Sequence, residues 1–413
     1  MEFFKKTFFK ITNFKEVHNG YIYRDGLNIL DKPFEPNGYD VPGGLYFTTL
    51  EHIHKFYDYG CFLREITLPV DNVNFKVVLD PRKDKYHANM IILGNRYSLS
   101  DHVTYTNFGL SVPDKIEIMK MASIEGNLKI LKSCTEVKPK TQWDTWLCDS
   151  AAGNGHIKVL KWARENGWPW DDFTCRFAAQ NGYLKILKWL RQNGSPWNEF
   201  TCCYAALNGH LEVLKWAHEN GCPWDYDTCS LAAKNGHLEI LKYARENGCI
   251  WNSDTCSYAA QNGHLEILKW ARKNGCGWTH SVCSNAAKNG HMDVLKWARQ
   301  KCCPWNEITC YNAAKNGYLE VLKWVRESGC PWDAKTCSNA AKNGHLEVLK
   351  WARENGCPWD QIVCVKAAVN GYLEVLKWAI ENNCPWNPDD ISFVATKNGY
   401  LEISKWIDNM DKN

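Results

Sequence analysis

The 413-residue chain has no long apolar run of the kind that spans a membrane. Its amino terminus scatters lysine among phenylalanine, without the continuous apolar segment of a signal peptide. It also has little net charge: +3 overall, with 19 Lys and Arg against 17 Asp and Glu in residues 1–140, and 30 against 29 in the remainder. Nucleic-acid-binding proteins usually carry a clustered basic surface. We therefore expect neither a membrane protein nor a nucleic-acid partner.

Short motifs of common catalytic and metal sites are missing as well. The chain has no phosphate-binding GxxxxGK loop, no GxSxG and no HExxH, and no CxxC pair of the kind that zinc sites use. Cysteine itself is abundant, with 20 residues, but disulfide-rich domains are small and lack a large apolar core. This chain is rich in Leu, Ile, Val, Ala and Trp, so we expect reduced, buried cysteines in a cytosolic compartment. We expect no bound metal and no cofactor.

What the sequence does have is a repeat. Ten glycines follow one another at intervals of 27 residues, with a last interval of 28, and each stands in a version of TCSxAAKNGHLEVLKWARENGCPWD. A period between about 20 and 50 residues is typical of a solenoid, in which neighbouring supersecondary elements stack and bury their apolar faces together. Such arrays expose a long surface that suits a macromolecular partner. The glycines are Gly155, Gly182, Gly209, Gly236, Gly263, Gly290, Gly317, Gly344, Gly371 and Gly399.

One repeat contains the signals of two helices. Thr228 is the expected N-cap of a short first helix, which contains an Ala-Ala pair and stops at Gly236. An amphipathic second helix follows over residues 238–246, and Gly248 ends it. The next loop usually reads Cys-Pro-Trp. Proline prevents the helix from continuing, and tryptophan is large enough to seal the contact between repeats.

Two rows of tryptophan recur with the repeat, one on the second helix and one in the loop. Aromatic rows can be platforms for bases, but a side chain common to every repeat serves the contact between repeats, so we interpret both rows as packing. The histidine beside the turn glycine is often replaced by tyrosine, which a metal ligand or general base would not tolerate. The helical row is Trp162, Trp189, Trp216, Tyr243, Trp270, Trp297, Trp324, Trp351, Trp378 and Trp406; the loop row is Trp143, Trp170, Trp197, Trp224, Trp251, Trp278, Trp305, Trp332, Trp359 and Trp386.

These residues resemble ankyrin repeats. GHLEVLKWARENG, as from Gly344 onward, matches the second-helix segment of that family, and the Ala-Ala pair matches its first helix. The pattern CPWD…TC…AAxNGHLEVLKWARENG, preceded by a separate N-terminal region, is similar to that of the ankyrin-array proteins of giant DNA viruses. The resemblance implies a mainly α fold: an ankyrin-like helical solenoid over residues 113–413, with about eleven helix-turn-helix repeats, the first a degenerate one at Gly126. The repeats are shorter than the family's period of about 33 residues, which implies that compact loops replace its β-hairpin fingers.

Residues 1–112 carry no repeat and are expected to form a small α+β domain. Residues 62–68 and 75–79 read as strands and residues 50–59 as a helix, with turns at Gly38, Pro42, Gly43 and Gly44. The domain faintly resembles ADP-ribosyltransferase folds. His18, the Tyr23-Arg24 pair and the Leu45-Tyr46-Phe47-Thr48 string carry that resemblance. Glu65 is the candidate for the catalytic glutamate that it implies, although no supporting motif surrounds Glu65.

We expect a non-enzymatic, monomeric scaffold that binds a protein partner through its repeat face, in the host-cell cytoplasm if the protein is viral. Specificity would come from the two variable positions before each Ala-Ala pair. Two alternatives stay open: an N-terminal enzyme that the array directs to its target, and a structural component of the virion. The candidate partner-binding residues are Arg176, Phe177, Tyr204, Tyr258, Asn285, Tyr311, Asn312, Asn339 and Lys366, with Arg176 and the three tyrosines as expected anchors.

Overall fold

The computed structural model describes residues 7–18, 20–34, 44–80, 84–112, 116–135 and 144–410. The chain divides into two compact units, Met1–Trp197 and Asn198–Asn413, which we call the N-terminal unit and the C-terminal unit and describe separately. Gly38, Pro42, Gly43 and Trp143 lie outside the described residues.

The N-terminal unit begins with a seven-stranded sheet in the order β4-β9-β6-β1-β5-β8-β7, in which each pair of neighbouring strands is antiparallel. A small hairpin, β2-β3, stands beside it. The predicted helix at Leu50 is a 3₁₀ helix, η2, and both predicted strands are present, the second starting later than expected. The elements are β1 (Phe8–Thr12), β2 (Val17–His18), β3 (Tyr21–Ile22), β4 (Gly26–Ile29), β5 (Leu45–Thr49), η2 (Leu50–Tyr59), β6 (Phe62–Thr67), β7 (Val77–Leu79), β8 (Tyr86–Ala88), β9 (Met90–Ser98) and α1 (His102–Phe108).

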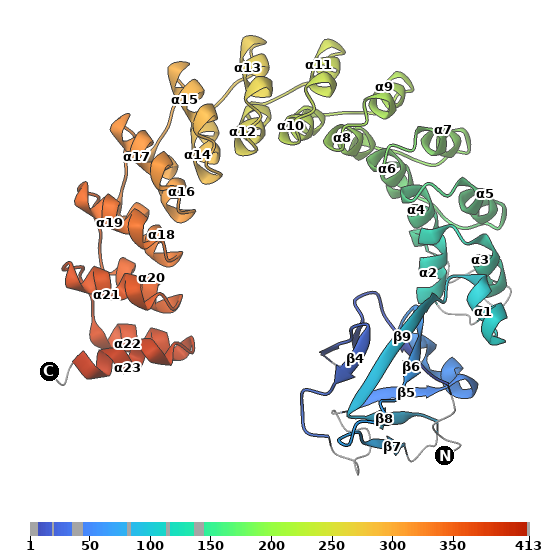
Figure 1. The fold of residues 1–413 in the computed structure, drawn as a ribbon. Coiled ribbons are helices and arrows are strands. Elements are labelled where there is room, and N and C mark those ends of the chain that lie inside the picture. The colour runs from blue at the N-terminus through green and yellow to red at the C-terminus, as the bar shows by residue number, and fades with distance from the viewer. Residues whose placement is uncertain are drawn as a thin grey trace. The chain divides into compact units, whose positions relative to one another are not determined.

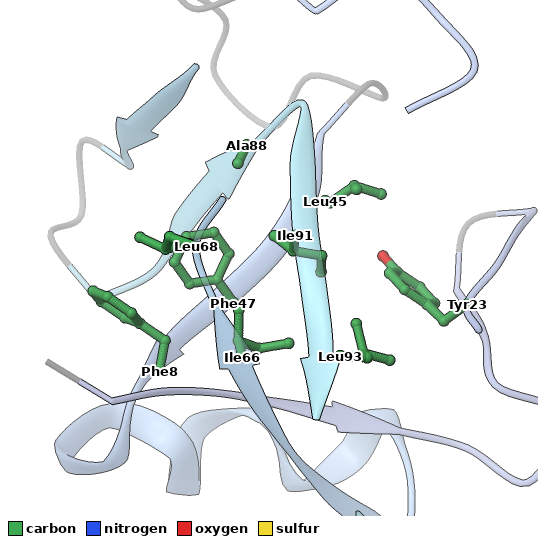
Figure 2. Packing of buried hydrophobic residues seen from close by; sticks show 9 residues of the cluster. All are labelled: Phe8, Tyr23, Leu45, Phe47, Ile66, Leu68, Ala88, Ile91 and Leu93. Atoms are coloured by element: carbon green, nitrogen blue, oxygen red, sulfur yellow. The ribbon is translucent and has the colours of Figure 1, made fainter. Parts of the chain in front are cut away.

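The central strand β1 is buried on both faces, because successive side chains point to opposite sides of the sheet. Phe8 points into an apolar cluster with Phe47, Ile66 and Ile91, whose side chains gather on one side of these strands in Figure 2. Phe9 points to the other face and meets the ring of Phe108 in α1, with centroids 5.3 Å apart. The sheet is therefore covered on both faces, which accounts for an independent core in this part of the chain.

Helix pairs follow the sheet within the N-terminal unit. We call the even-numbered member of each pair the first helix and the odd-numbered member the second helix. First helices pack side by side, α2 against α4 and α4 against α6, and each packs against its own second helix. The helices are α2 (Ile116–Glu125), α3 (Leu128–Thr135), α4 (Trp146–Gly153), α5 (Ile157–Glu165), α6 (Asp172–Gln180) and α7 (Leu184–Gln192).

The C-terminal unit consists of eight further helix pairs, so the described residues contain the eleven pairs that the sequence predicts. No strand occurs between residues 144 and 410, in agreement with the absence of β-hairpin fingers. The predicted domain boundary after residue 112 stays a prediction. The helices are α8 (Glu199–Leu207), α9 (Leu211–Glu219), α10 (Tyr226–Lys234), α11 (Leu238–Glu246), α12 (Ser253–Gln261), α13 (Leu265–Lys273), α14 (His280–Lys288), α15 (Met292–Gln300), α16 (Glu307–Lys315), α17 (Leu319–Glu327), α18 (Ala334–Lys342), α19 (Leu346–Glu354), α20 (Ile362–Val369), α21 (Leu373–Glu381), α22 (Pro388–Lys397) and α23 (Leu401–Met410).

The first helices start earlier than the sequence suggested, and Thr228 is not an N-cap. In α10 the cap is Asp225, whose carboxylate accepts a hydrogen bond from the backbone N–H of Asp227 at 2.9 Å. Thr228 lies one turn inside and is fully buried. The residue after the loop tryptophan combines an extended backbone with a short side-chain acceptor, which is what an N-cap needs. The same position caps six other first helices, as Asp171, Asn198, Asn252, Thr279, Asn306 and Asp333.

Candidate interaction surface

The first helices from α10 to α20 are each covered on three sides and open on the fourth. Helix α10 packs against α8, against α12 and against its own second helix α11, and the helices up to α20 repeat this arrangement. Figure 1 shows the first helices of this unit along the inner side of its curve and the second helices along the outer side. The open side of each first helix therefore faces inward.

The open side carries three residues from each first helix. They stand nine, five and two residues before the turn glycine, a spacing that places them on one helical face. We call this set on α8 to α20 the stripe. All of its residues except the buried Asn312 are half-buried or exposed, and the neighbouring Thr, Cys and Ala residues are buried. The stripe comprises Phe200, Tyr204 and Leu207; Asp227, Leu231 and Lys234; Asp254, Tyr258 and Gln261; Ser281, Asn285 and Lys288; Ile308, Asn312 and Lys315; Lys335, Asn339 and Lys342; and Ile362, Lys366 and Val369.

Most predicted partner-binding residues occupy the middle position of this face. Tyr204, Tyr258, Asn285, Asn312, Asn339 and Lys366 belong to the stripe, and Phe177 has the same place on α6 in the N-terminal unit. Arg176 and Tyr311 stand one residue earlier, where four repeats have a buried serine. Arg176 packs its guanidinium over Phe173 and Phe177, with Cζ 4.2 and 5.0 Å from the ring centroids.

Of the three stripe asparagines, Asn285 and Asn312 contact the preceding first helix. The side-chain amide of Asn312 donates to the carbonyl of Ser284 on the preceding first helix at 2.9 Å, and only 8% of the residue is exposed. Asn285 makes a longer contact of the same kind, 3.5 Å to the carbonyl of Ser257. Asn339 instead donates to the carbonyl of Lys335 within its own helix. Asn339 is thus more accessible to a partner than Asn312.

The stripe changes character along the C-terminal unit. On α8, α10 and α12 it is aromatic and slightly acidic, with Asp227 and Asp254 against Lys234, whose ammonium lies over the ring of Tyr258. On α14 to α20 it has no aromatic and no acidic residue. There it carries Lys288, Lys315, Lys335, Lys342 and Lys366, none of which forms an ion pair with another described residue.

The lysines of the second helices behave differently. Lys242 pairs with Glu239 three residues earlier at 2.7 Å, and the same i,i+3 pair recurs on other second helices, for example Lys350 with Glu347 at 2.9 Å. On α9, α11, α13, α17, α19 and α21 this lysine is paired within its own helix, whereas the five lysines of the stripe on α14 to α20 have no such pair among the described residues.

Comparison with known proteins agrees with the repeat geometry. Family models of ankyrin repeats match residues 148–191, 175–218 and 202–276. A solved structure, the human ASB11 ankyrin repeat domain, is 18% identical with a TM-score of 0.33 and covers 38% of this chain and 84% of that one. An ankyrin repeat protein of Acanthamoeba polyphaga mimivirus is 44% identical over 138 residues, which are 32% of this chain and 68% of that protein. The chain belongs to the ankyrin-repeat family. An uncharacterized protein of the same virus is 44% identical over 132 residues, 30% of this chain and 95% of that one.

The tryptophan rows of this ankyrin array form the contacts between repeats. The loop residue Trp251 has the guanidinium of Arg245 on one side, 4.2 Å from its ring centroid, and the ring of Trp270 from the next second helix on the other, 5.8 Å away and nearly perpendicular. The same arrangement recurs from Trp278 to Trp359. One junction differs at both flanks: His218 replaces the arginine and stacks on Trp224 at 3.5 Å, and Tyr243 replaces the tryptophan. The paired replacement indicates that the three side chains act as one packing group.

The turn histidines hold neighbouring ankyrin repeats together. Nε2 of His264 lies 3.1 Å from the carbonyl oxygen of Lys234, 30 residues earlier, so this nitrogen carries the proton and donates. The ring also covers Gly236, where a Cβ would lie 2.9 Å from Cε1 of His264. Burial, with the neighbouring His237 and His291, lowers the pKa of His264, and the hydrogen bond to Lys234 opposes this shift. The His264 ring therefore serves the contact between repeats.

The cysteines of the array are free thiols, and among the described residues only Cys302 is exposed. Cys249 donates to the carbonyl of Asp225 in the preceding loop at 3.1 Å, and this contact recurs from repeat to repeat. Burial raises the pKa of Cys148 to about 12. The part of the chain that the structure describes contains no group of three or more His, Cys, Asp or Glu that could hold a metal ion.

The N-terminal sheet separates His18 from Glu65, the candidate glutamate of the alternative interpretation. Lys10 faces Arg64 across β1 and β6, and Phe9 faces Glu65, so Glu65 points to the face opposite Lys10. His18 lies on the Lys10 side, with Nδ1 3.4 Å from the ammonium. The carboxylate of Glu65 instead accepts from the hydroxyl of Tyr97 at 2.9 Å. His18 and Glu65 therefore lie on opposite sides of the sheet.

Sequence reasoning found the middle of the stripe and missed its two ends. The two residues before Ala-Ala vary within a string that otherwise recurs from repeat to repeat, which marks them as candidates. The residues nine and two positions before the turn glycine lie in segments that the sequence assigns to the N-cap and to the end of the helix. The helical period would have revealed these two outer positions. From the middle position, steps of four residues back and three forward reach Lys335 and Lys342 on α18.

Proposed function

We propose that this ankyrin-repeat protein is a non-enzymatic scaffold that binds a protein partner along the stripe. The observation that carries the proposal is the contrast between two faces of the same helices. The buried faces of the first helices repeat Thr-Cys and Ala-Ala with few changes, and the open face changes in every repeat. In a solenoid, a constant interior with a variable surface is the pattern of a recognition array.

The strongest anchors of such an interface are aromatic and arginine side chains, which dominate interface energies in proteins. Phe200 exposes 43% of its surface beside Tyr204 on α8, and Tyr258 is half-exposed on α12. Tyr311 provides a further half-exposed ring at the edge of the stripe. Arg176 and Phe177 supply an equivalent surface in the N-terminal unit.

The mimivirus relatives support a viral origin. We propose that the protein acts as a monomer in the cytoplasm of the infected cell. The many free, buried thiols fit a reducing compartment. No helix of the described residues is both long and apolar enough to cross a bilayer.

The test replaces Tyr204, Tyr258 and Tyr311 together by Ala in the full chain, followed by affinity purification from expressing cells and quantitative mass spectrometry. We expect the specific partner to be lost, because each truncated anchor costs about 1–2 kcal/mol of binding. The matched control carries Lys215→Ala, Lys242→Ala and Lys269→Ala on the second helices, and it should retain the partner. Retention of every partner by the tyrosine variant would show that recognition uses another surface.

A further inference from the structure

We propose that the stripe of α14 to α20 binds an acidic polypeptide segment of the partner. This inference rests on the proposed function, and it adds the chemistry of the ligand and its direction along the array. The segment lies across the four first helices, with its carboxylates next to Lys288, Lys315, Lys335, Lys342 and Lys366.

The first argument is the uncompensated charge. The stripe of these four helices holds five lysines and no acidic residue, although the chain as a whole is close to neutral, at +3. Six lysines on the second helices of the C-terminal unit instead pair with a glutamate three residues earlier, as Lys323 does with Glu320 at 2.8 Å. The five stripe lysines have no such partner among the described residues. An opposite charge supplied by a ligand would satisfy them all on one surface.

The second argument is the spacing. Packed helices lie about 8–10 Å apart, so the four first helices present their lysines over roughly 30 Å. An extended chain advances about 3.3 Å per residue, and a segment of about nine residues therefore spans the set. Because each helix contributes one or two lysines, acidic residues at about every third position can match them.

The third argument concerns what lies between the lysines. Asn339 offers an amide that can donate to and accept from a peptide backbone, and Ser281 a hydroxyl. Single-stranded nucleic acids are held by aromatic platforms and by arginine, and the stripe of α14 to α20 has neither. The aromatic residues are concentrated on α8 and α12 instead. These features favour a polypeptide over a nucleic acid.

The two parts of the stripe together give the partner a direction. Phe200, Tyr204, Leu231 and Tyr258 form an apolar and aromatic part, and the five lysines form a basic part further along the same face. A partner segment that fits the whole face carries apolar side chains at one end and carboxylates at the other. The interface is then anchored at the first part and steered electrostatically at the second.

The experiment measures the fluorescence anisotropy of a labelled peptide that is titrated with the full chain. The peptide has about 12 residues, long enough to span the four helices, and every third residue is Glu while the others are Ser. A peptide with Gln in place of Glu and an oligothymidylate of similar length serve as comparison probes. We expect the Glu peptide to bind, the Gln peptide to bind at least about tenfold more weakly, and affinity to fall as salt is raised.

The decisive variant combines Lys288→Glu, Lys315→Glu, Lys335→Glu and Lys342→Glu. Its control combines Lys215→Glu, Lys269→Glu, Lys323→Glu and Lys350→Glu, which changes the net charge equally on the second helices. The stripe variant should lose at least about tenfold in affinity for the Glu peptide, since each exposed pair contributes a factor of about 1.5 to 5, and the control should lose less than about threefold. A set of Lys→Gln changes at the stripe positions repeats the test if charge reversal impairs folding, which circular dichroism reports.

Equal losses in the two variants, or equal or tighter binding of the oligothymidylate, would overturn the proposal. The proposal would also be overturned if the chain bound no peptide but associated with itself, and the stripe variant abolished this self-association. If the Glu peptide does not bind while the tyrosine variant still loses its cellular partner, the charge assignment fails and the scaffold function stands. If the tyrosine variant retains every partner, the scaffold face itself is wrong.

Discussion

The buried face of the first helices is nearly constant from repeat to repeat, whereas the open face of the same helices varies. In the interior, Cys, Ala and the loop tryptophan recur almost without change, and two replacements meet at one junction, His218 and Tyr243 around Trp224. On the stripe, Tyr258, Asn285 and Lys366 occupy equivalent places with no compensating change. The comparison teaches that stability in this array is shared between repeats, whereas recognition can vary one repeat at a time.

The comparison predicts that substitutions at a junction between repeats destabilise the array and that stripe substitutions do not. The largest effect is expected for Trp251→Ala, which removes the ring between Arg245 and Trp270. We expect a loss of about 2–3 kcal/mol in the free energy of unfolding, less than for a fully buried tryptophan because Trp251 is half-buried. Urea unfolding followed by circular dichroism measures it.

Two matched controls accompany that measurement. Ile250→Ala changes the neighbouring loop residue, 62% exposed, and Lys342→Ala changes the stripe; both should stay within about 0.5 kcal/mol of wild type. A loss at Lys342 as large as that at Trp251 would remove the distinction between the two faces.

The second prediction compares two glycines of one repeat that share a left-handed backbone, Gly236 at φ +86° and Gly248 at φ +85°. A Cβ on Gly248 meets nothing within 4 Å, whereas one on Gly236 meets the ring of His264. Gly248→Ala should therefore cost about 1 kcal/mol of backbone strain. Gly236→Ala should cost about 2 kcal/mol, because it also disturbs the contact with the next repeat.

A double variant separates the two causes. If the ring contact is responsible, Gly236→Ala added to His264→Ala should cost only about the 1 kcal/mol of backbone strain, and the two changes should not be additive. Additive losses would assign the whole effect to the backbone.

The third prediction concerns a repeat that departs from the interior pattern. Cys302 stands where most repeats have glycine at the end of the second helix, and its φ is +58°, a conformation that costs a residue with a side chain about 1–2 kcal/mol. Cys302→Gly should raise stability by about 0.5–1 kcal/mol after the extra entropy of the unfolded glycine is counted. Cys302→Ser keeps the strain and should show no gain, so a gain with serine would point to the thiol instead.

The sequence predicts the array well because its determinants are local and repeated. Turn glycines, the Ala-Ala pair and the amphipathic period each specify structure within a few residues. Because the same signals recur in eleven repeats, the assignment of the helices has little ambiguity. The N-cap was misplaced because Thr228 and Asp225 are both good capping residues, and only the burial of Thr228 against the preceding repeat decides between them.

The N-terminal sheet could be predicted only in part, because strand pairing is not local. Strand β4 pairs with β9, some sixty residues away along the chain by the registers Gly26–Leu93 and Ile29–Met90. No residue pattern in either strand specifies that register. For the same reason the sequence could not show that His18 and Glu65 lie on opposite faces, or that the stripe lysines lack ion-pair partners.

The smallest predicted effect is the pH response of the clamp between repeats. The pKa of His264 is lowered in the folded array, mainly by burial, so the unfolded chain binds a proton more readily. The contribution of the neutral imidazole to stability is therefore complete above the unfolded value of about 6.5 and declines as the pH falls below it. His264→Tyr introduces the residue that other repeats have at this place, as at Tyr318, and keeps a ring against the turn glycine. Melting temperatures between about pH 5 and 8 should fall less on acidification for His264→Tyr than for the wild type, and identical pH profiles would show that the histidine stays paired without regard to its protonation.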